Sequence, residues 1–270
     1  MSKVASIQFG FSDKDSKEDR IRKAEKLIDS AADADLILLP ELWNFGWHTL
    51  FDKDVASIDN LRKYSKTLEG ETISRIAEKA RKTNSYIAAG SILERKDDDS
   101  FYNTAVLLDP KGKVIATFSK MHLANYLGYQ EVTLLKRGRD ITAVKTELGI
   151  LGFSICLDLR FPELYRKMAV EKGVEVFLLV SQFALARLEN WLDLCHARAI
   201  ENQCYLISCD CVGTDRGSQY LGYSAIIDPR GVTIAGSGTT ECIVKGEIDL
   251  EELHKFREVM PHLQNRALSV

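Results

Sequence analysis

Residues 104–116 read Thr104-Ala-Val-Leu-Leu-Asp109-Pro-Lys-Gly112-Lys-Val-Ile-Ala116, and residues 224–235 repeat the pattern as Ser224-Ala-Ile-Ile-Asp228-Pro-Arg-Gly231-Val-Thr-Ile-Ala235. Each stretch predicts a β-hairpin, because an Asp-Pro-x-Gly turn joins two apolar runs. Proline presets φ in such a turn, and glycine permits the exit conformation. Two unrelated turns that match by chance are the alternative. The matching flanks favour an internal duplication.

Strands and helices alternate ahead of each hairpin. In the first half the patterns predict strands at 4–9, 36–39 and 86–92, and helices at about 16–32 and after residue 72. In the second half they predict strands at 150–155 and 174–180, and a helix at 191–203. We therefore expect an α/β fold in which two similar sheets pack face to face with helices outside, because this buries both inner faces.

Composition limits the class of protein. The chain has 270 residues, 45% of them apolar, and no linker-like stretch divides it, so we expect a single domain over residues 1–270. No apolar run reaches the ~18 residues of a membrane-spanning helix, and the N-terminus lacks the apolar core of a signal peptide. The net charge of −3 predicts no nucleic-acid partner. Six cysteines without disulfide or metal-site spacing favour a cytoplasmic location.

The best candidate for a catalytic nucleophile is Cys156, in Gly152-Phe-Ser-Ile-Cys156-Leu-Asp158-Leu-Arg160-Phe-Pro162-Glu163. An apolar strand ends at this point, and Pro162 suits the first turn of a following helix. Backbone N–H groups and the helix dipole would favour a thiolate there and would receive an oxyanion. On this stretch alone an inert buried thiol is favoured, because free cysteines are commonly buried.

Two further predicted strands end in charged residues. Leu36-Ile-Leu-Leu-Pro40-Glu41 places Glu41 after one strand, and the strand at 113–118 leads to Lys120. Ligands bind at the carboxyl ends of strands in open α/β sheets. Hydrolysis of an amide or a nitrile through a thioester needs a thiol that attacks, a carboxylate that moves protons and a cation that stabilises negative charge. The three strand ends supply these groups.

Taken in order, these stretches resemble the nitrilase superfamily of carbon–nitrogen hydrolases. The matching elements are Leu-Pro-Glu at 39–41, Lys-x-His-Leu at 120–123, Cys-x-Asp-x-Arg-Phe-Pro-Glu at 156–163 and Arg-Ala-Ile-Glu-Asn-Gln at 198–203. The resemblance covers nearly the whole chain. It implies an α-β-β-α sandwich of two face-packed mixed sheets with outer helices. It also implies chemistry that requires neither a metal ion nor an organic cofactor.

The resemblance assigns roles to individual residues. Glu41 would be the general base and acid, Lys120 the partner of the oxyanion, and Cys156 the nucleophile. The backbone N–H of Leu157 would be a second oxyanion donor. Glu131 matches a second glutamate that is often found in these sites, and the alternative is that it is a solvated carboxylate in a loop.

Aromatic and amide side chains near the motifs are candidates for the substrate pocket. Trp43, Phe45 and Trp47 follow Glu41, and for each ring core packing is an equal alternative to lining the pocket. Gln182 would hydrogen-bond a substrate amide or carboxylate, and Phe183 would pack against its chain. Many relatives have a Pro or Asn-Trp pattern at this point, and the departure here leaves the choice of substrate open.

The remaining polar residues of the motifs are expected to serve mainly the structure. We expect His122 to make a structural hydrogen bond and Asp158 to orient the backbone at the turn. Arg160 and Glu163 are expected to form a local ion pair. Arg187 is a candidate partner for a substrate carboxylate, although exposure to solvent is the favoured interpretation.

Length and motif order most resemble the small omega-amidase-type members, which act on short dicarboxylate monoamides such as 2-oxoglutaramate. We therefore expect a small amide substrate, with hydrolysis of a nitrile or of an N-carbamoyl amine as enzymatic alternatives. A non-catalytic binding or scaffold protein of the same fold is the alternative from another class. By resemblance the helix at 191–203 helps to build a homodimer or a higher homo-oligomer. The alternative from the sequence alone is that its polar residues form a network within one chain. The tail at 250–270 is a further candidate for the dimer contact.

Overall fold

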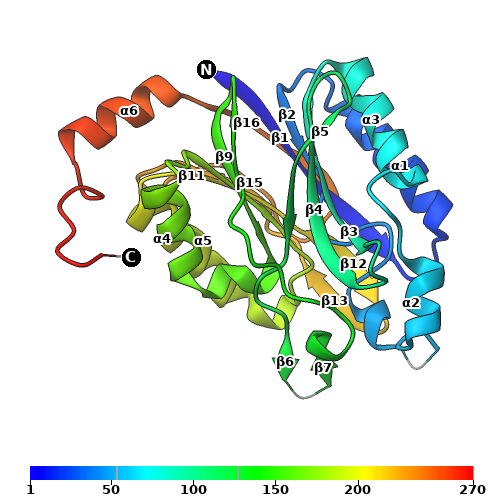
Figure 1. The fold of residues 1–270 in the computed structure, drawn as a ribbon. Coiled ribbons are helices and arrows are strands. Elements are labelled where there is room, and N and C mark those ends of the chain that lie inside the picture. Colours follow the sequence, from blue (N-terminus) through cyan, green and yellow to red (C-terminus); the bar gives the residue numbers. More distant parts are fainter. Residues whose placement is uncertain (53, 127, 270) are drawn as a thin grey trace.

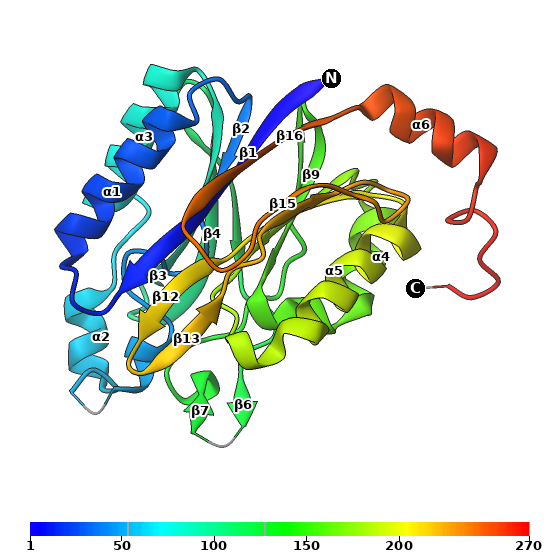
Figure 2. The ribbon, with the colours of Figure 1, turned by 180° about the vertical axis from the view of Figure 1, so that it is seen from behind.

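Two β-sheets pack face to face at the centre of the molecule, and helices cover their outer sides (Figures 1 and 2). The computed structural model describes residues 1–52, 54–126 and 128–269. The first sheet has the order β13 (Ser218–Leu221), β12 (Cys211–Asp215), β1 (Ser2–Ser12), β2 (Leu36–Leu38), β3 (Tyr86–Arg95), β4 (Phe101–Leu108) and β5 (Val114–Ser119), and β16 (Cys242–Ile248) also pairs with β1. The second sheet has the order β15 (Thr233–Gly236), β14 (Ala225–Ile227), β11 (Tyr205–Cys209), β10 (Val176–Val180), β9 (Gly149–Ile155) and β8 (Ala143–Thr146).

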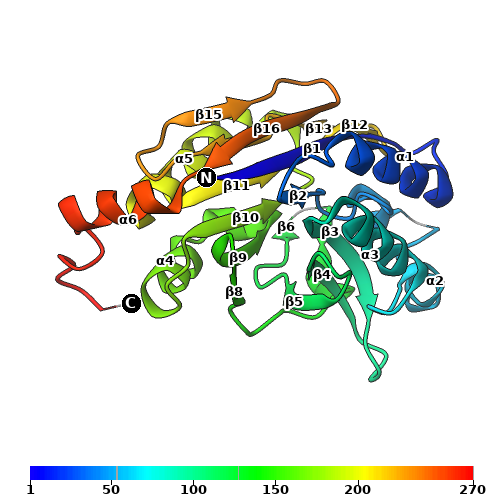
Figure 3. The ribbon, with the colours of Figure 1, turned by 90° about the horizontal axis from the view of Figure 1, so that it is seen from above.

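Each sheet has its own helices. Helices α1 (Lys17–Ser30) and α3 (Glu71–Thr83) lie beside the first sheet, and α4 (Pro162–Glu171) and α5 (Leu188–Asn202) lie beside the second (Figure 3). The short helix α2 (Ile58–Tyr64) follows the loop after β2, and α6 (Leu250–Val259) extends from the body near the N-terminus. The predicted α-β-β-α sandwich of two mixed sheets is confirmed.

The topology repeats in the way that the two hairpin sequences predict. Strands β1, β2 and β3 are parallel neighbours, and β4 and β5 continue that sheet as an antiparallel hairpin. Strands β9, β10 and β11 are likewise parallel, and β14 and β15 continue the second sheet as an antiparallel hairpin. The two halves therefore share one topology, and chance similarity of the turns no longer explains the match.

Apolar periodicity places the core on both sides of the sheets. Val4, Leu36 and Leu107 of the first sheet share one buried cluster with Phe153 and Leu178 of the second. Alternate strand residues face the helices instead, because successive side chains of a strand point to opposite faces. A second cluster accordingly joins the first sheet to α1 and α3. Burial of both faces fixes the register of the strands, and the register fixes which residues lie at the strand ends.

Irregular segments fill one end of the sandwich. The small hairpin of β6 (Asn125–Tyr126) and β7 (Tyr129–Gln130) lies there, and the N-terminus and α6 lie at the opposite end (Figure 1). The described residues also form four short 3-10 helices, namely η1 (His48–Phe51), η2 (Glu131–Thr133), η3 (Cys156–Arg160) and η4 (Leu185–Arg187). Within the described residues, no helix is both long enough and apolar enough to pass through a bilayer.

Candidate active site

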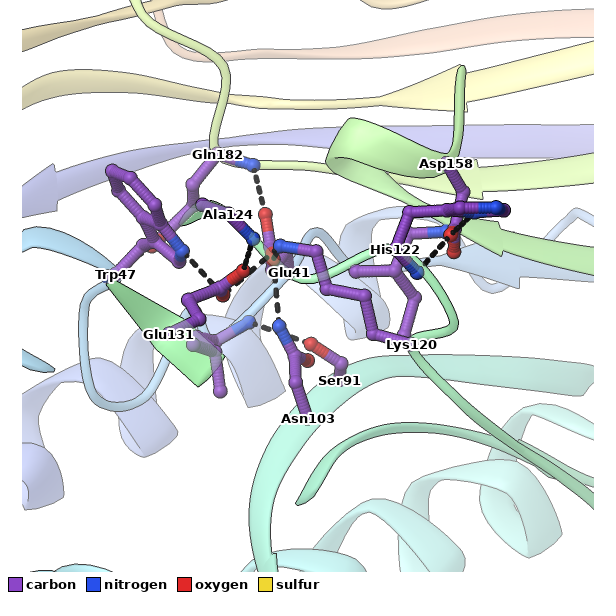
Figure 4. A network of polar contacts seen from close by, with 12 residues as sticks. Glu41, Trp47, Ser91, Asn103, Lys120, His122, Ala124, Glu131, Asp158 and Gln182 are labelled. Atoms are coloured by element: carbon purple, nitrogen blue, oxygen red, sulfur yellow. Dashed lines mark hydrogen bonds and ion pairs between the residues drawn. The ribbon is translucent and has the colours of Figure 1, made fainter. Parts of the chain in front are cut away.

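Three of the predicted residues meet in one buried cluster, although they come from separate elements (Figure 4). Glu41 follows β2, Lys120 follows β5, and Glu131 begins η2. The Lys120 ammonium lies 3.1 Å from Glu41 Oε1 and 3.0 Å from Glu131 Oε1. All three side chains are at most 1% exposed. Burial of three charges in one place is costly unless they neutralise one another, and here one cation serves two carboxylates.

The Glu41 carboxylate is held from several directions. Its Oε1 accepts a hydrogen bond from Asn103 Nδ2 at 2.7 Å, and its Oε2 accepts one from the backbone N–H of Gln182 at 2.9 Å. The next residue, Leu42, has a φ of +40° and donates its N–H to Ser91 Oγ at 3.1 Å. A leucine in this left-handed conformation is strained, so surrounding contacts must hold it there.

Glu131 belongs to the same cluster and is not a solvated loop residue. Its Oε1 also accepts from the indole N–H of Trp47 at 2.7 Å, and its Oε2 accepts from the backbone N–H of Ala124 at 2.7 Å. The side chain is fully buried. Both carboxylates of the cluster therefore have fixed orientations, and the Lys120 ammonium is held between them (Figure 4).

Cys156 stands at a sharp turn between β9 and α4, as its sequence predicts. Its φ is +48°, an unusual conformation for a residue with a side chain, and it begins η3. Asp158 braces this turn, because its Oδ2 accepts from Ile155 N–H at 3.0 Å. Asp158 Oδ1 accepts from the His122 backbone N–H at 2.9 Å and lies 2.7 Å from His122 Nδ1. The structural roles predicted for Asp158 and His122 agree with these contacts.

The charges around Cys156 determine its protonation. Burial raises the pKa of the Cys156 thiol well above its usual value, and the Glu41 carboxylate adds to the rise. Burial also raises the pKa of Glu41, although the Lys120 ammonium opposes this. Burial disfavours the charge on Lys120, but the Glu131 and Glu41 carboxylates outweigh it, so the pKa of Lys120 lies well above its usual value. The resting site thus contains a protonated lysine and a protonated thiol.

A cavity of about 530 Å³ opens onto this cluster. Cys156, Lys120 and Leu157 line it, and so do Gln182 and Phe183. Four further lining residues have aromatic rings, namely Trp47, His48, Tyr126 and Tyr129. Three others are polar, namely Arg160, Arg187 and Asn190. A space of this size with a few polar groups on apolar walls is typical of a small-molecule site.

Two of the three rings that follow Glu41 do not line this cavity. Trp43 lies in the core, where its indole N–H donates to the Ala89 carbonyl at 2.9 Å, and Phe45 packs on Tyr64 beside a separate cavity. The turn at Leu42 explains both, because it redirects the chain so that Trp47 is the ring that reaches the cavity.

Arg160 does not form the ion pair with Glu163 that the sequence predicts, so this prediction is wrong. Its guanidinium donates instead to Asn190 Oδ1 at 3.0 Å and lies 5.6 Å from the centre of the Phe183 ring. Arg160 belongs to η3, and Glu163 lies in the first turn of α4 beyond Pro162. The helical spacing that the ion pair needs is broken between them, so Arg160 is free to line the cavity.

Several residues of the site were missed from sequence, chiefly Asn103, His48 and Tyr129. Asn103 had a signal, because it is an amide within the largely apolar strand β4, where it is fully buried. His48 and Tyr129 had none, since their loops have no regular periodicity. They come together with Trp47, which stacks on Tyr129 at 5.0 Å between ring centres.

Comparison with known proteins decides the family. The model of the carbon-nitrogen hydrolase family matches residues 3–258. The chain belongs to the carbon–nitrogen hydrolase family. It is 32% identical to the 2-oxoglutaramate amidase of Paenarthrobacter nicotinovorans over 99% of this chain and 90% of that protein. It is 35% identical to the 2-oxoglutaramate amidase of Bacillus subtilis over 96% of this chain and 95% of that protein.

Solved structures agree with the family. The crystal structure of Nit3 from Saccharomyces cerevisiae, a member of branch 10 of the nitrilase superfamily, matches with a TM-score of 0.85 at 29% identity. The match covers 99% of this chain and 97% of that one. The predicted membership of the nitrilase superfamily is thus confirmed, and with it the prediction of a hydrolase of carbon–nitrogen bonds at the level of the family.

Proposed function

We propose that this carbon–nitrogen hydrolase is an omega-amidase, which cleaves the terminal amide of a small dicarboxylate monoamide of the 2-oxoglutaramate type. The observation that carries the proposal is the cavity itself. It is lined by Cys156 and Lys120, where an amide would react, and by the guanidinium groups of Arg160 and Arg187, which would bind a carboxylate. The names of two relatives, both 2-oxoglutaramate amidases, support the same substrate class.

The first step would form a thioester. Glu41 takes the thiol proton of Cys156 while the sulfur attacks the amide carbon. A proton that moves from the thiol to Glu41 leaves the net charge of the buried cluster unchanged, so it avoids the cost of creating a new buried charge. The carbonyl oxygen becomes an oxyanion, and the Lys120 ammonium with the Leu157 N–H stabilises it. Leu157 is the second residue of η3, a position whose N–H has no acceptor within its helix.

The second step would release the products. Glu41 passes its proton to the departing nitrogen, and ammonia leaves as the tetrahedral intermediate collapses to the thioester. Glu41 then accepts a proton from a water molecule, which attacks the thioester carbon. Collapse of this second intermediate expels the thiolate, which recovers the proton from Glu41 and releases the acid. Glu131 keeps Lys120 charged and in place through both steps, because it is the second partner of the ammonium.

The test measures ammonia release from 2-oxoglutaramate, succinamate, butyramide, a short aliphatic nitrile and an N-carbamoyl amine. We expect the parent to prefer the two amides that carry a carboxylate, and Cys156→Ala to release no ammonia. Preference for the nitrile or the carbamoyl compound would replace the proposal by one of those activities. Silence of the parent on the whole panel would favour the non-catalytic alternative.

A matched pair of variants tests the carboxylate contact. Arg160→Gln should lower kcat/KM for 2-oxoglutaramate roughly 10- to 100-fold, because a hydrogen bond to a charged group is lost. The same variant should leave hydrolysis of butyramide, which has no carboxylate, nearly unchanged. Arg22→Gln, at an exposed arginine on α1, is the control and should behave as the parent. An equal loss on both substrates would contradict a role for Arg160 in recognising the carboxylate.

We further propose that residues 1–270 act as one domain in a cytoplasmic homodimer. Ile200 of α5, Val232 and Ile234 are 44–58% exposed, and Ile200 lies beside the turn that carries Val232. The tail from 250 to 269 adds Val259 and Leu268, which are also exposed. Free cysteines suit a reducing compartment. Sedimentation of the parent against Ile234→Glu checks the dimer, and a monomeric parent would contradict it.

A further inference from the structure

We propose that Asp215 and Tyr220, in the hairpin of β12 and β13, are positioning residues for the proposed hydrolysis. They hold Gln182 in the orientation that fixes Glu41 on one side and the Trp47 loop on the other. The inference rests on the proposed function, because it assigns these residues to the same reaction. Neither residue stands in a motif of the sequence, and both lie outside the group of side chains that lines the cavity.

Gln182 connects the two carboxylates of the site. Its backbone N–H donates to Glu41 Oε2 at 2.9 Å, and its side-chain Oε1 accepts from the backbone N–H of Trp47 at 2.5 Å. Trp47 in turn donates its indole N–H to Glu131 Oε1. A rotation of the Gln182 side chain would therefore release the Trp47 backbone, and with it one of the contacts that orient Glu131 (Figure 4).

Tyr220 and Asp215 hold the Gln182 side chain from behind. The Tyr220 hydroxyl lies 2.9 Å from Gln182 Oε1 and 2.7 Å from Asp215 Oδ2, and it accepts from Trp47 N–H at 3.2 Å. Asp215 also accepts from Thr49, at 2.9 Å from its hydroxyl and 3.2 Å from its N–H. Asp215, Tyr220 and Gln182 are at most 2% exposed, so water does not compete for these bonds.

The donors and acceptors in this series of hydrogen bonds are mutually consistent. Trp47 N–H can only donate, so the atom of Gln182 that faces it must be the oxygen. Burial raises the pKa of Tyr220 well above its usual value, and the Asp215 carboxylate adds to the rise, so the phenol keeps its proton. That proton goes to Asp215 or to Gln182. A phenylalanine at 220 would remove this one donor from between the two oxygens inside the protein, where an unmade hydrogen bond is costly.

The hydrogen bonds from Asp215 through Tyr220 to Gln182 affect the reaction through Glu41. Lys120, Glu131, Cys156, Asp210 and Cys211 are the titratable groups near this carboxylate among the described residues, and burial is the main cause of its raised pKa. The hydrogen bond from Gln182 N–H lowers that pKa, because it stabilises the ionised form. If the bond is loosened, Glu41 takes up a proton at a higher pH. The acid limb of the activity profile should then move to higher pH, because the protonated carboxyl cannot act as a base.

The experiment compares Tyr220→Phe and Asp215→Asn with Tyr165→Phe. The control removes an equally buried tyrosine hydroxyl, one that donates to Ser154 Oγ at 2.6 Å and has no link to Glu41. For the amide that the parent hydrolyses best, we expect kcat of both test variants to fall about 10- to 100-fold, because small misplacements of catalytic groups are expensive. KM should change less than about three-fold, and the acid limb of kcat should move up only in the test variants. A loss of kcat with the parent's pH profile would be a structural effect and would overturn the inference.

A second readout is independent of the substrate. The rate at which iodoacetamide alkylates Cys156, measured against pH by mass spectrometry of the intact protein, reports on the ionisation of the thiol, which the Glu41 carboxylate disfavours. We expect its midpoint to shift in Tyr220→Phe and in Asp215→Asn and to stay with the parent in Tyr165→Phe. Unshifted midpoints in the folded test variants would overturn the inference. A parent that hydrolyses no amide but shows the shifts would refute the proposed function and leave the positioning intact.

Discussion

The two hairpins that reveal the duplication lead to different parts of the molecule. Hairpin β4–β5 ends in the fully buried Lys120, between two carboxylates of the site. Hairpin β14–β15 ends near Ser237, whose hydroxyl donates to Gln8 Oε1 at 2.7 Å, and its strand β15 is largely exposed. The two sequences are similar because both build the edge of a sheet. The comparison teaches that the duplicated topology supplies a frame, and that single residues just beyond the strands supply the chemistry.

The middle parallel strands differ in the same way. Strand β2 leads to Glu41, which carries a charge, and β10 leads to Gln182, which is neutral. The two residues nevertheless meet, because Gln182 N–H donates to Glu41 Oε2. One half of the molecule therefore provides a proton-transfer group, and the other provides the contact that orients it.

The largest effect is expected at the two hairpin ends. Lys120→Ala should lower kcat by about 10²- to 10³-fold or more, because one oxyanion donor is lost. Ser237→Ala, at the corresponding end of β15, should keep kcat close to that of the parent. Steady-state kinetics of both variants would check this, with circular dichroism to verify the fold. Turnover of Lys120→Ala within a few-fold of the parent would show that the two ends differ in structure only.

The site could be predicted where its residues stand directly beyond regular strands. Glu41, Lys120 and Cys156 follow apolar runs whose burial fixes their register, so their meeting could be inferred. The sequence could not show whether Trp43 or Trp47 lines the cavity, because the direction of the chain there depends on the φ of +40° at Leu42. The residue type at 42 does not predict this conformation.

Long-range contacts were also beyond the sequence. Asp215 and Tyr220 reach the site because the chain crosses from the second sheet to the first at Asp210, between β11 and β12. Thr49, which donates to Asp215, is 166 residues away from it in the chain. The alternation of Cys209 and Cys211 indicates a strand there, but it gives no sign of a change of sheet. Local periodicity thus determines the fold class. The placement of Asp215 and Tyr220 behind the site depends on strand pairings that periodicity does not encode.

The contrast between Glu41 and Gln182 predicts a smaller, pH-dependent effect. Burial raises the pKa of Glu41 above its usual 4.5, so activity should be lost at a higher pH than for an ordinary carboxyl as the solution is acidified. Asn103→Ala removes the 2.7 Å hydrogen bond to Glu41 Oε1, so the ionised form loses support and the acid limb should rise further. A pH series of kcat/KM would measure both midpoints. An acid limb of the variant at or below that of the parent would contradict this account of Glu41.

The smallest expected effect is on stability rather than on activity, and it distinguishes the turns of the two hairpins. Gly112 has a φ of +73° and Gly231 a φ of +84°, so alanine at either position should cost about 1–2 kcal/mol of stability from backbone strain. A Cβ at 112 would also lie 2.6 Å from the Ala77 carbonyl oxygen, which is backbone of α3, and 2.3 Å from the end of the Arg81 side chain. A Cβ at 231 would meet the Ile200 side chain alone, at 2.4 Å, and that side chain is half exposed and can move. Gly112→Ala should therefore be less stable than Gly231→Ala in urea unfolding, with both keeping the parent's kcat. The reverse order would mean that the Ile200 side chain is held more firmly than the backbone of α3, as it would be if a second copy of the chain covered it.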